Sequence, residues 1–162
     1  MKKFLVLLFL IHAIISVFTY DYAINNPSDS TLYWLLNYDI HQYNWLDFFK
    51  VGSPFMVFLN YPFLKLEAPF WLGHIIYSII GFFGIYLFAK WALEVFKARS
   101  GNLLAFVLLA FIFFSPNLHV WTSFIGKDAI VFSSLSALFY TSLSFKKRWI
   151  LGVIATFLLV MI

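Results

Sequence analysis

The sequence predicts an all-α protein, a polytopic bundle of transmembrane helices with a large outer loop that contains amphipathic or interfacial helices. Of the 162 residues, 63% are hydrophobic and only 11% are charged, whereas a soluble domain is about half apolar and about a quarter charged. Several apolar runs approach the roughly 20 residues that a helix needs to cross a bilayer. No internal repeat divides the chain, so residues 1–162 are expected to form a single membrane domain.

Five apolar stretches are the predicted spans. The basic start of the first also fits a cleaved signal peptide, but the stretch ends in VFTY without a small-x-small cleavage site, which favours an uncleaved anchor. The third contains Pro116, so its helix must continue past the proline or kink there. The fifth is too short to span, which suggests the N-terminal piece of a longer protein. In chain order, the stretches are 4–20, 69–89, 103–121, 129–145 and 149–162.

The charges predict which ends of these spans lie outside. With the N-terminus in the cytoplasm, the inner segments hold eight of the eleven basic residues, as the positive-inside rule expects. The outer side then receives six of the seven acidic residues, and Glu94 alone lies inside. Because the basic residues flank apolar runs and form no stripe with interleaved aromatics, no nucleic-acid partner is expected.

The outer loop, residues 21–68, is too long for a simple connector. Apolar residues between Leu32 and Phe49 recur at helical spacing and predict an amphipathic helix along the outer interface. The apolar run 53–64 contains two prolines and is interpreted as a re-entrant or interfacial segment packed on the other helices. Small residues within the spans 69–89 and 129–145 favour close helix packing.

Asp29, at the start of the predicted loop helix, has two interpretations. It could cap the helix by accepting hydrogen bonds from free backbone N–H groups. It could also be a catalytic carboxylate that the helix end orients, and the two roles are compatible.

Lys127 and Asp128 form a charged pair between two apolar stretches at the outer side. Asp128 could cap the next span while Lys127 reaches lipid phosphates of the membrane. Alternatively, the pair binds a phosphorylated or polyol substrate, with the lysine as a point charge on phosphate. Asp29 is expected on the same face, which raises the question of whether the two loops meet over one pocket.

The four histidines form no ligand cluster in the sequence. His12 and His74 lie inside predicted spans and are interpreted as hydrogen-bonded core residues, whereas His41 and His119 are expected to face outward. A divalent cation is one candidate cofactor. Neither a zinc-protease HExxH motif, a P-loop nor a dinucleotide fingerprint occurs.

Together these features resemble the N-terminal half of polytopic glycosyltransferases of the GT-C type, including bacterial relatives of the protein mannosyltransferases and polysaccharide-assembly members. Asp29 with Tyr33, in DSTLYW, looks like the Asp-x-x-x-Tyr element of the first outer loop. The run Asn60-Tyr61-Pro62-Phe63 looks like the Tyr-Pro element before the second span. Ser115-Pro116, Trp121-Thr122-Ser123 and Gly126-Lys127-Asp128-Ala129 are similar to the second outer loop.

The resemblance implies transfer of a sugar from a polyprenyl-phosphate-linked donor to a glycan, lipid or protein acceptor at the outer face of a bacterial cytoplasmic membrane, in cell-envelope polysaccharide synthesis. Asp29 would deprotonate or hold the acceptor hydroxyl. Tyr33 would contact substrate, Lys127 would steady the departing lipid phosphate, and Asp128 would orient the acceptor or a metal.

Two other functions stay open. One is a repeat-unit polymerase or ligase of surface polysaccharide. The other is a non-enzymatic transporter or assembly subunit, which should place polar groups near the bilayer midplane. The acidic residues of this chain cluster at the predicted outer ends rather than near the midplane, which favours surface chemistry.

Overall fold

The computed structural model describes residues 2–34, 39–99 and 103–162, and every regular element within these ranges is helical. The all-α fold class is therefore confirmed for the described chain. In order, the elements are α1 (Lys2–Asn25), α2 (Asp29–Trp34), η1 (Ile40–Gln42), η2 (Trp45–Phe48), α3 (Ser53–Lys65), α4 (Phe70–Arg99), α5 (Leu103–Phe113), α6 (Pro116–Ser123), α7 (Lys127–Ser142) and α8 (Phe145–Met161).

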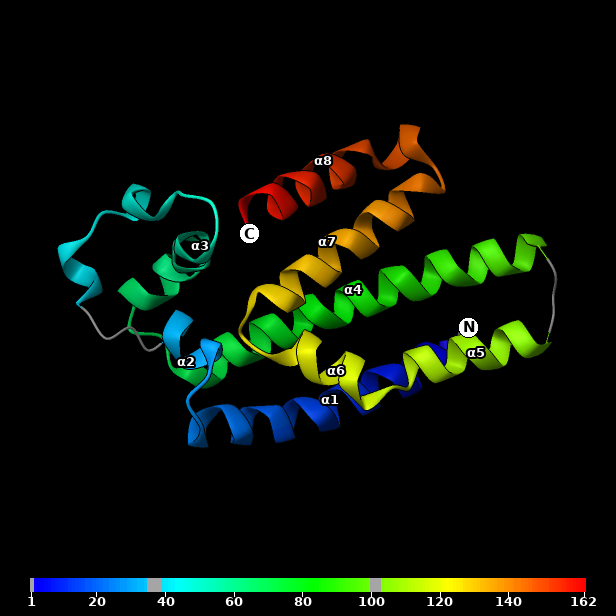
Figure 1. The fold of residues 1–162 in the computed structure, drawn as a ribbon, viewed down its shortest axis with the longest axis horizontal. Coiled ribbons are helices and arrows are strands. Elements are labelled where there is room, and N and C mark those ends of the chain that lie inside the picture. Colours follow the sequence, from blue (N-terminus) through cyan, green and yellow to red (C-terminus); the bar gives the residue numbers. More distant parts are fainter. Residues whose placement is uncertain (1, 35–38, 100–102) are drawn as a thin grey trace.

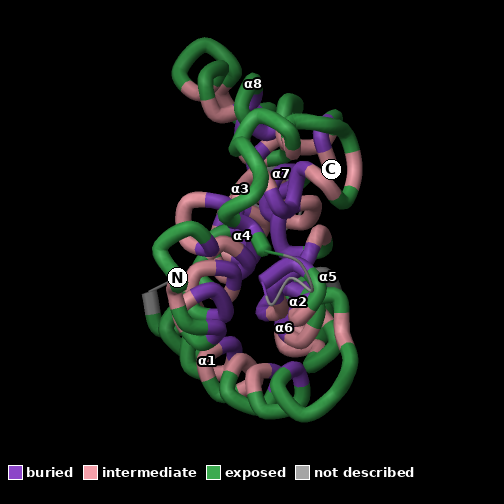
Figure 2. Tube along the Cα trace, turned by 90° about the vertical axis from the view of Figure 1, so that its left-hand side faces the viewer, coloured by how far each residue is buried: buried purple, intermediate pink, exposed green. Residues whose placement is uncertain are grey.

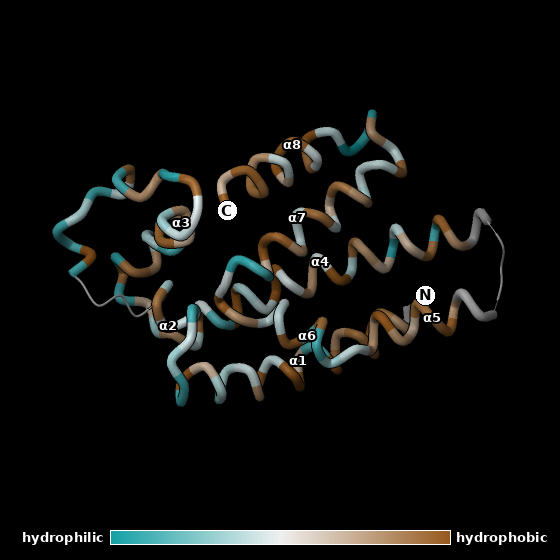
Figure 3. The backbone as a smooth tube through the Cα atoms, viewed as in Figure 1, coloured by the Kyte–Doolittle hydropathy of each residue, from teal (hydrophilic) through white to brown (hydrophobic). Residues whose placement is uncertain are grey.

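The longer helices run side by side along the longest axis, while α2, α3 and the two short 3-10 helices gather at one end (Figure 1). At this end, which we call the loop end, α1 ends, α4 begins, α6 ends and α7 begins. The opposite end, the basic end, holds the end of α4 and the turn into α8 with Lys146, Lys147 and Arg148. Figure 3 shows that hydrophobic positions predominate along the long helices, whereas hydrophilic positions lie mainly in the turns at both ends. Which end lies outside a membrane stays a prediction.

Two helices, α1 and α4, are long and apolar enough to cross a membrane, and a third span exists if α5 and α6 form one. α5 and α6 meet at Ser115-Pro116 with a bend of 42°, so the predicted kink is confirmed. α7 and α8 have 16 and 17 residues. They cover about 25 Å at the helical rise, less than the roughly 30 Å of a hydrocarbon core. In the described chain, therefore, only two of the five predicted spans, or three if α5 and α6 act as one, are long and apolar enough to cross a membrane.

Small residues allow α4 to approach its neighbours closely, as expected. A Cβ atom at Gly84 would lie 2.7 Å from the Cα atom of Ser133 in α7. The hydroxyl of Ser133 donates to the carbonyl of Ile80 at 2.6 Å. Buried positions accordingly face the interior shared by these helices, and exposed positions cover the outside of the bundle (Figure 2).

The predicted amphipathic helix between Leu32 and Phe49 is wrong. α2 ends at Trp34, residues 35–38 lie outside the described ranges, and η1 and η2 follow as separate short turns. Side chains bonded to the local backbone favour turns over a continuous helix. The backbone N–H of His41 donates to the Asp39 carboxylate at 2.9 Å and lowers the pKa of that carboxyl. The Asp47 carboxylate also accepts a hydrogen bond from the backbone N–H of Asn44, at 2.9 Å.

Candidate functional site

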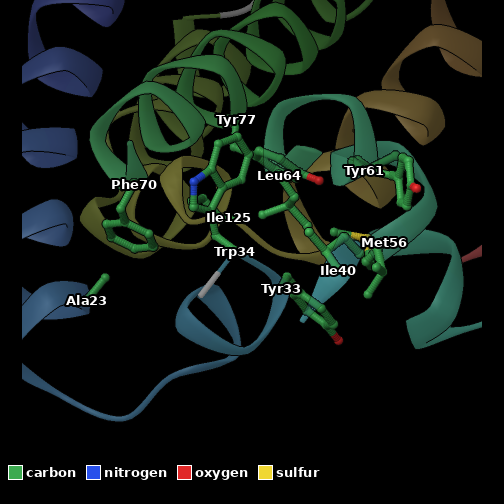
Figure 4. Close-up of a cluster of buried hydrophobic side chains, with 13 residues drawn as sticks. Ala23, Tyr33, Trp34, Ile40, Met56, Tyr61, Leu64, Phe70, Tyr77 and Ile125 are labelled. Atoms are coloured by element: carbon green, nitrogen blue, oxygen red, sulfur yellow. The ribbon is translucent and has the colours of Figure 1, made fainter. Parts of the chain in front are cut away.

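A buried tryptophan fixes α2 on the start of α4. Trp34 is buried, and its indole N–H donates to the carbonyl of Ala68 at 3.0 Å. The ring fits the space left by the missing side chain of Gly73, where a Cβ atom would lie 2.5 Å from it. Figure 4 shows the ring near Phe70 and Ile125 within this cluster. The short helix that carries Asp29 and Tyr33 is thereby held in place by packing.

A polar chain of contacts ties α2 to α3 and α4. The amide of Asn60 in α3 donates to the carbonyl of Tyr33 at 3.0 Å, and the phenol of Tyr77 in α4 donates to the Asn60 side-chain oxygen at 2.9 Å. Asn60 is 2% exposed, so these bonds satisfy groups that water does not reach. They hold α2 and α3 at a fixed distance, and the pocket described next lies between these helices and the start of α7.

Asp29, Tyr33 and Lys127 line one open pocket of about 580 Å³ at the loop end. The two loops, whose meeting over one pocket the sequence left as a question, therefore meet at these three residues. The remaining lining comes from η2 and α3 together with one further residue of α2: Leu32, Phe48, Ser53, Pro54 and Val57.

The Asp29 carboxylate is free for a ligand. The Ser28 carbonyl accepts the first helical bonds, from the backbone N–H groups of Thr31 and Leu32, so Ser28 holds the cap position and Asp29 is the first residue of α2. The alternative of Asp29 as the helix cap is therefore wrong. No described residue donates a hydrogen bond to its exposed carboxylate or forms an ion pair with it.

Three helices begin at this pocket. Asp29 is the first residue of α2, Ser53 is the first of α3, and Lys127 is the first of α7. Helix starts carry free backbone N–H groups and a partial positive charge. Gly126 before α7 has no side chain that could satisfy these groups. The phenol of Tyr33 and the hydroxyl of Ser53 lie 3.4 Å apart. The pocket thus combines one carboxylate, one ammonium and two hydroxyls.

Asp128 lies elsewhere, although it follows Lys127 directly. Its exposed side chain lines a second hollow of about 510 Å³ between the α5–α6 break and α7, with Asn117 and Trp121. It is the second residue of α7 and not its cap, which is Gly126. Asp29 and Asp128 therefore do not form a carboxylate pair, and the predicted grouping of Asp128 with the other site residues is not observed. Successive residues of a helix point in different directions, which explains the separation.

Lys127 is partly buried and unpaired. No carboxylate of the described chain lies within ion-pair distance of its ammonium, Asp29 included. The ammonium is thus available to an anion that enters the pocket.

The histidines differ from expectation at one position. His41 is exposed, and its Nε2 lies 3.9 Å from the Glu67 carboxylate. His12 and His74 are buried and hydrogen-bonded, as predicted. His119 is wrongly predicted to face outward, since it is 0% exposed and contacts His12. A separate helix, α6, begins at Pro116 and turns His119 inward. The apolar pattern of the predicted span 103–121 does not contain the direction of that turn.

No described group of three or more His, Asp or Glu residues is arranged to hold a metal ion. No protein-family model matches the chain, and comparison with the curated proteins and with the solved structures returns no match.

Proposed function

We propose that this chain is a membrane glycosyltransferase, which moves a sugar from a polyprenyl-phosphate-linked donor to an acceptor hydroxyl at the outer face of the membrane. The observation that carries the proposal is the pocket lined by Asp29, Tyr33 and Lys127. It lies at the end of a bundle whose longest helices are apolar enough to enter a bilayer. A donor with a lipid tail stays in the membrane with its head group at the surface. A pocket at the end of membrane-spanning helices is in a position to meet that head group.

The residues of the pocket fit the two ends of the reaction. A carboxylate without a protein partner can take the proton of an acceptor hydroxyl. The acceptor oxygen then forms a bond to the anomeric carbon, and the bond from that carbon to the donor phosphate oxygen breaks. The electron pair leaves with the phosphate, which gains negative charge.

Lys127 and the helix starts of α3 and α7 supply positive potential for the departing phosphate. Because Lys127 and Asp29 line the same pocket without forming an ion pair, neither neutralises the other before substrate binds. Tyr33 and Ser53 can donate hydrogen bonds to sugar or phosphate oxygens. A repeat-unit polymerase or ligase of surface polysaccharide would use the same groups on a similar donor.

A non-enzymatic transporter or assembly subunit is the second candidate. The observation that favours it is the set of buried histidines, His12, His74 and His119, inside the helix bundle. Ionisable residues within transmembrane segments often mark a transport path.

The replacement Asp29→Asn separates the two candidates. It keeps the shape of the side chain and removes the base, so we expect transfer of radiolabelled sugar from polyprenyl-phosphate hexose to fall by about 10²–10⁴-fold in membranes containing the protein. Asp21→Asn is the matched control, because Asp21 is exposed and does not line the pocket. Wild-type transfer by the Asp29 variant, at equal amounts of inserted protein, would contradict the catalytic assignment.

A further inference from the structure

His12 and His119 meet inside the bundle, where α1 passes α6. Their exposed fractions are 2% and 0%, and their Nδ1 atoms lie 3.1 Å apart. The two residues are 107 positions apart in the sequence, so the contact joins distant parts of the chain. The pocket at the loop end does not use them.

Each ring is anchored through its other nitrogen. His12 Nε2 lies 3.0 Å from the carbonyl oxygen of Ser78 in α4, and His119 Nε2 lies 2.8 Å from the carbonyl oxygen of Phe113 in α5. A carbonyl oxygen accepts hydrogen bonds and cannot donate them, so each Nε2 atom carries the hydrogen.

A proton count then shows a deficit between the rings. A neutral imidazole has one N–H, which both histidines place on Nε2. Both Nδ1 atoms are then bare, and two lone pairs face each other at 3.1 Å in a space closed to water. One additional proton converts this contact into an N–H···N hydrogen bond between an imidazolium and an imidazole, which is charge-assisted and therefore stronger than a neutral one.

The ring geometry favours a proton over a metal ion. The ring centroids are 5.3 Å apart, close to the nitrogen separation plus the two ring radii, so the rings point nearly end to end. A metal ion bonded to both nitrogens at about 2.0 Å would need lone pairs that converge on a point beside that line. Nor does the described chain supply a third His, Asp or Glu to complete such a site.

The surroundings limit the pair to a single proton. Phe82 of α4 packs against His12 with ring centroids 5.7 Å apart, and no charged side chain contacts either ring among the described residues. Besides His119, the titratable group close enough to interact electrostatically with His12 is His74 of α4. Its Nε2 forms a hydrogen bond with the carbonyl oxygen of Ser16. Without a carboxylate nearby, two imidazolium rings in contact would bring together two N–H groups and two like charges.

We propose that His12 and His119 form a proton-binding site within the helix bundle, and that they hold one proton between their Nδ1 atoms. The bound proton ties α1 to α6. Ser123, at the end of α6, also contacts α1 through the hydroxyl of Thr19 at 3.0 Å, and Lys127 follows four residues later. Proton binding thereby strengthens the attachment of α6 to α1, and α6 leads directly to the start of α7, where Lys127 lies.

Ring nitrogen NMR of the whole protein, labelled with ¹⁵N-histidine in detergent micelles, tests the proposal between about pH 8 and about pH 3. This range extends below the usual window for histidine because burial without a counter-charge disfavours the charged ring. We expect both Nε2 atoms of the pair to stay protonated throughout. The two Nδ1 signals should shift together in one step that adds one proton in total. His41→Gln, which removes an exposed histidine, should leave that step unchanged.

The variant His119→Gln should abolish the shared step, because its amide donates to His12 Nδ1 without an added proton. The wild-type spectrum decides the question even if this variant does not fold. Uptake of two protons, uptake of none, or a neutral ring with hydrogen on Nδ1 and a bare Nε2 would each overturn the proposal. Loss of sugar transfer in Asp29→Asn is a separate outcome, so either idea can fail alone.

Discussion

At the scale of the residue, the glycines of α4 determine how closely its neighbours pack. A Cβ atom at Gly81 would collide with the backbone carbonyl oxygen of Thr122 in α6. Backbone cannot rotate away as a flexible side chain can, so the space must stay empty. Gly126 is the opposite case, since a Cβ atom there meets nothing within 4 Å and its φ of −171° is ordinary extended backbone.

Replacing Gly81 by alanine should therefore destabilise the protein by about 1–3 kcal/mol, the usual cost of overfilling a packed interior. The expected readout is a lower midpoint of thermal unfolding in detergent micelles. Gly126→Ala should leave that midpoint nearly unchanged. Equal midpoints for the Gly81 variant and wild type would show that the Thr122 backbone of α6 does not lie against Gly81 of α4.

At the scale of the element, the apolar pattern predicts the long helices well but not how the outer loop folds. Pro116 in the run 103–121 correctly indicates the break between α5 and α6. The spacing between Leu32 and Phe49 predicts one helix, yet Asp39 and Asp47 bond to nearby backbone N–H groups and favour short turns. Apolar periodicity does not register such local competition.

The candidate site could be predicted only in part, because the apolar pattern places the loops but not the individual side chains within them. The alternation of spans predicts that the two loops carrying Asp29 and Lys127 lie on the same side of the membrane. Which way Asp128 points depends on where α7 begins, and that start is set by the loop after α6. The contact between His12 and His119 joins helices far apart in sequence, so no local pattern contains it.

Asn60 tests how firmly α2, α3 and α4 are joined beneath the pocket. Asn60→Leu leaves the Tyr77 hydroxyl and the Tyr33 carbonyl without their partner, at about 1–3 kcal/mol for each buried group. We expect a corresponding fall in the free energy of unfolding, measured by denaturant titration in micelles. The variant should also lose sugar transfer, because α2 no longer holds Asp29 in place.

Tyr77→Phe supplies the matched comparison, since it removes one of the two bonds and keeps the ring. The double variant Asn60→Leu with Tyr77→Phe should be less destabilised than the sum of the two single changes, because the phenol that Asn60→Leu leaves unpaired is then absent. Additive losses would mean that the two side chains do not interact.

At the scale of the whole molecule, the two ends of the bundle differ in charge. Lys146 and Lys147 lie in the first turn of α8 at the basic end, and both are exposed. Asp29, Asp39, Asp47 and Glu67 lie at the loop end, where the pocket opens. Because basic residues are retained on the cytoplasmic side of a membrane, this division predicts that the loop end faces outward.

Single cysteines can test that orientation directly, because the natural chain has none. Leu66 is 79% exposed at the loop end and does not line the pocket with Asp29. Leu66→Cys should react with a membrane-impermeant maleimide in intact cells, whereas Lys147→Cys should react only after the cells are made permeable. The opposite pattern would place the pocket in the cytoplasm, where an outer-face glycosyl transfer could not occur. Reaction of both cysteines in intact cells would mean that no membrane separates the two ends of the bundle.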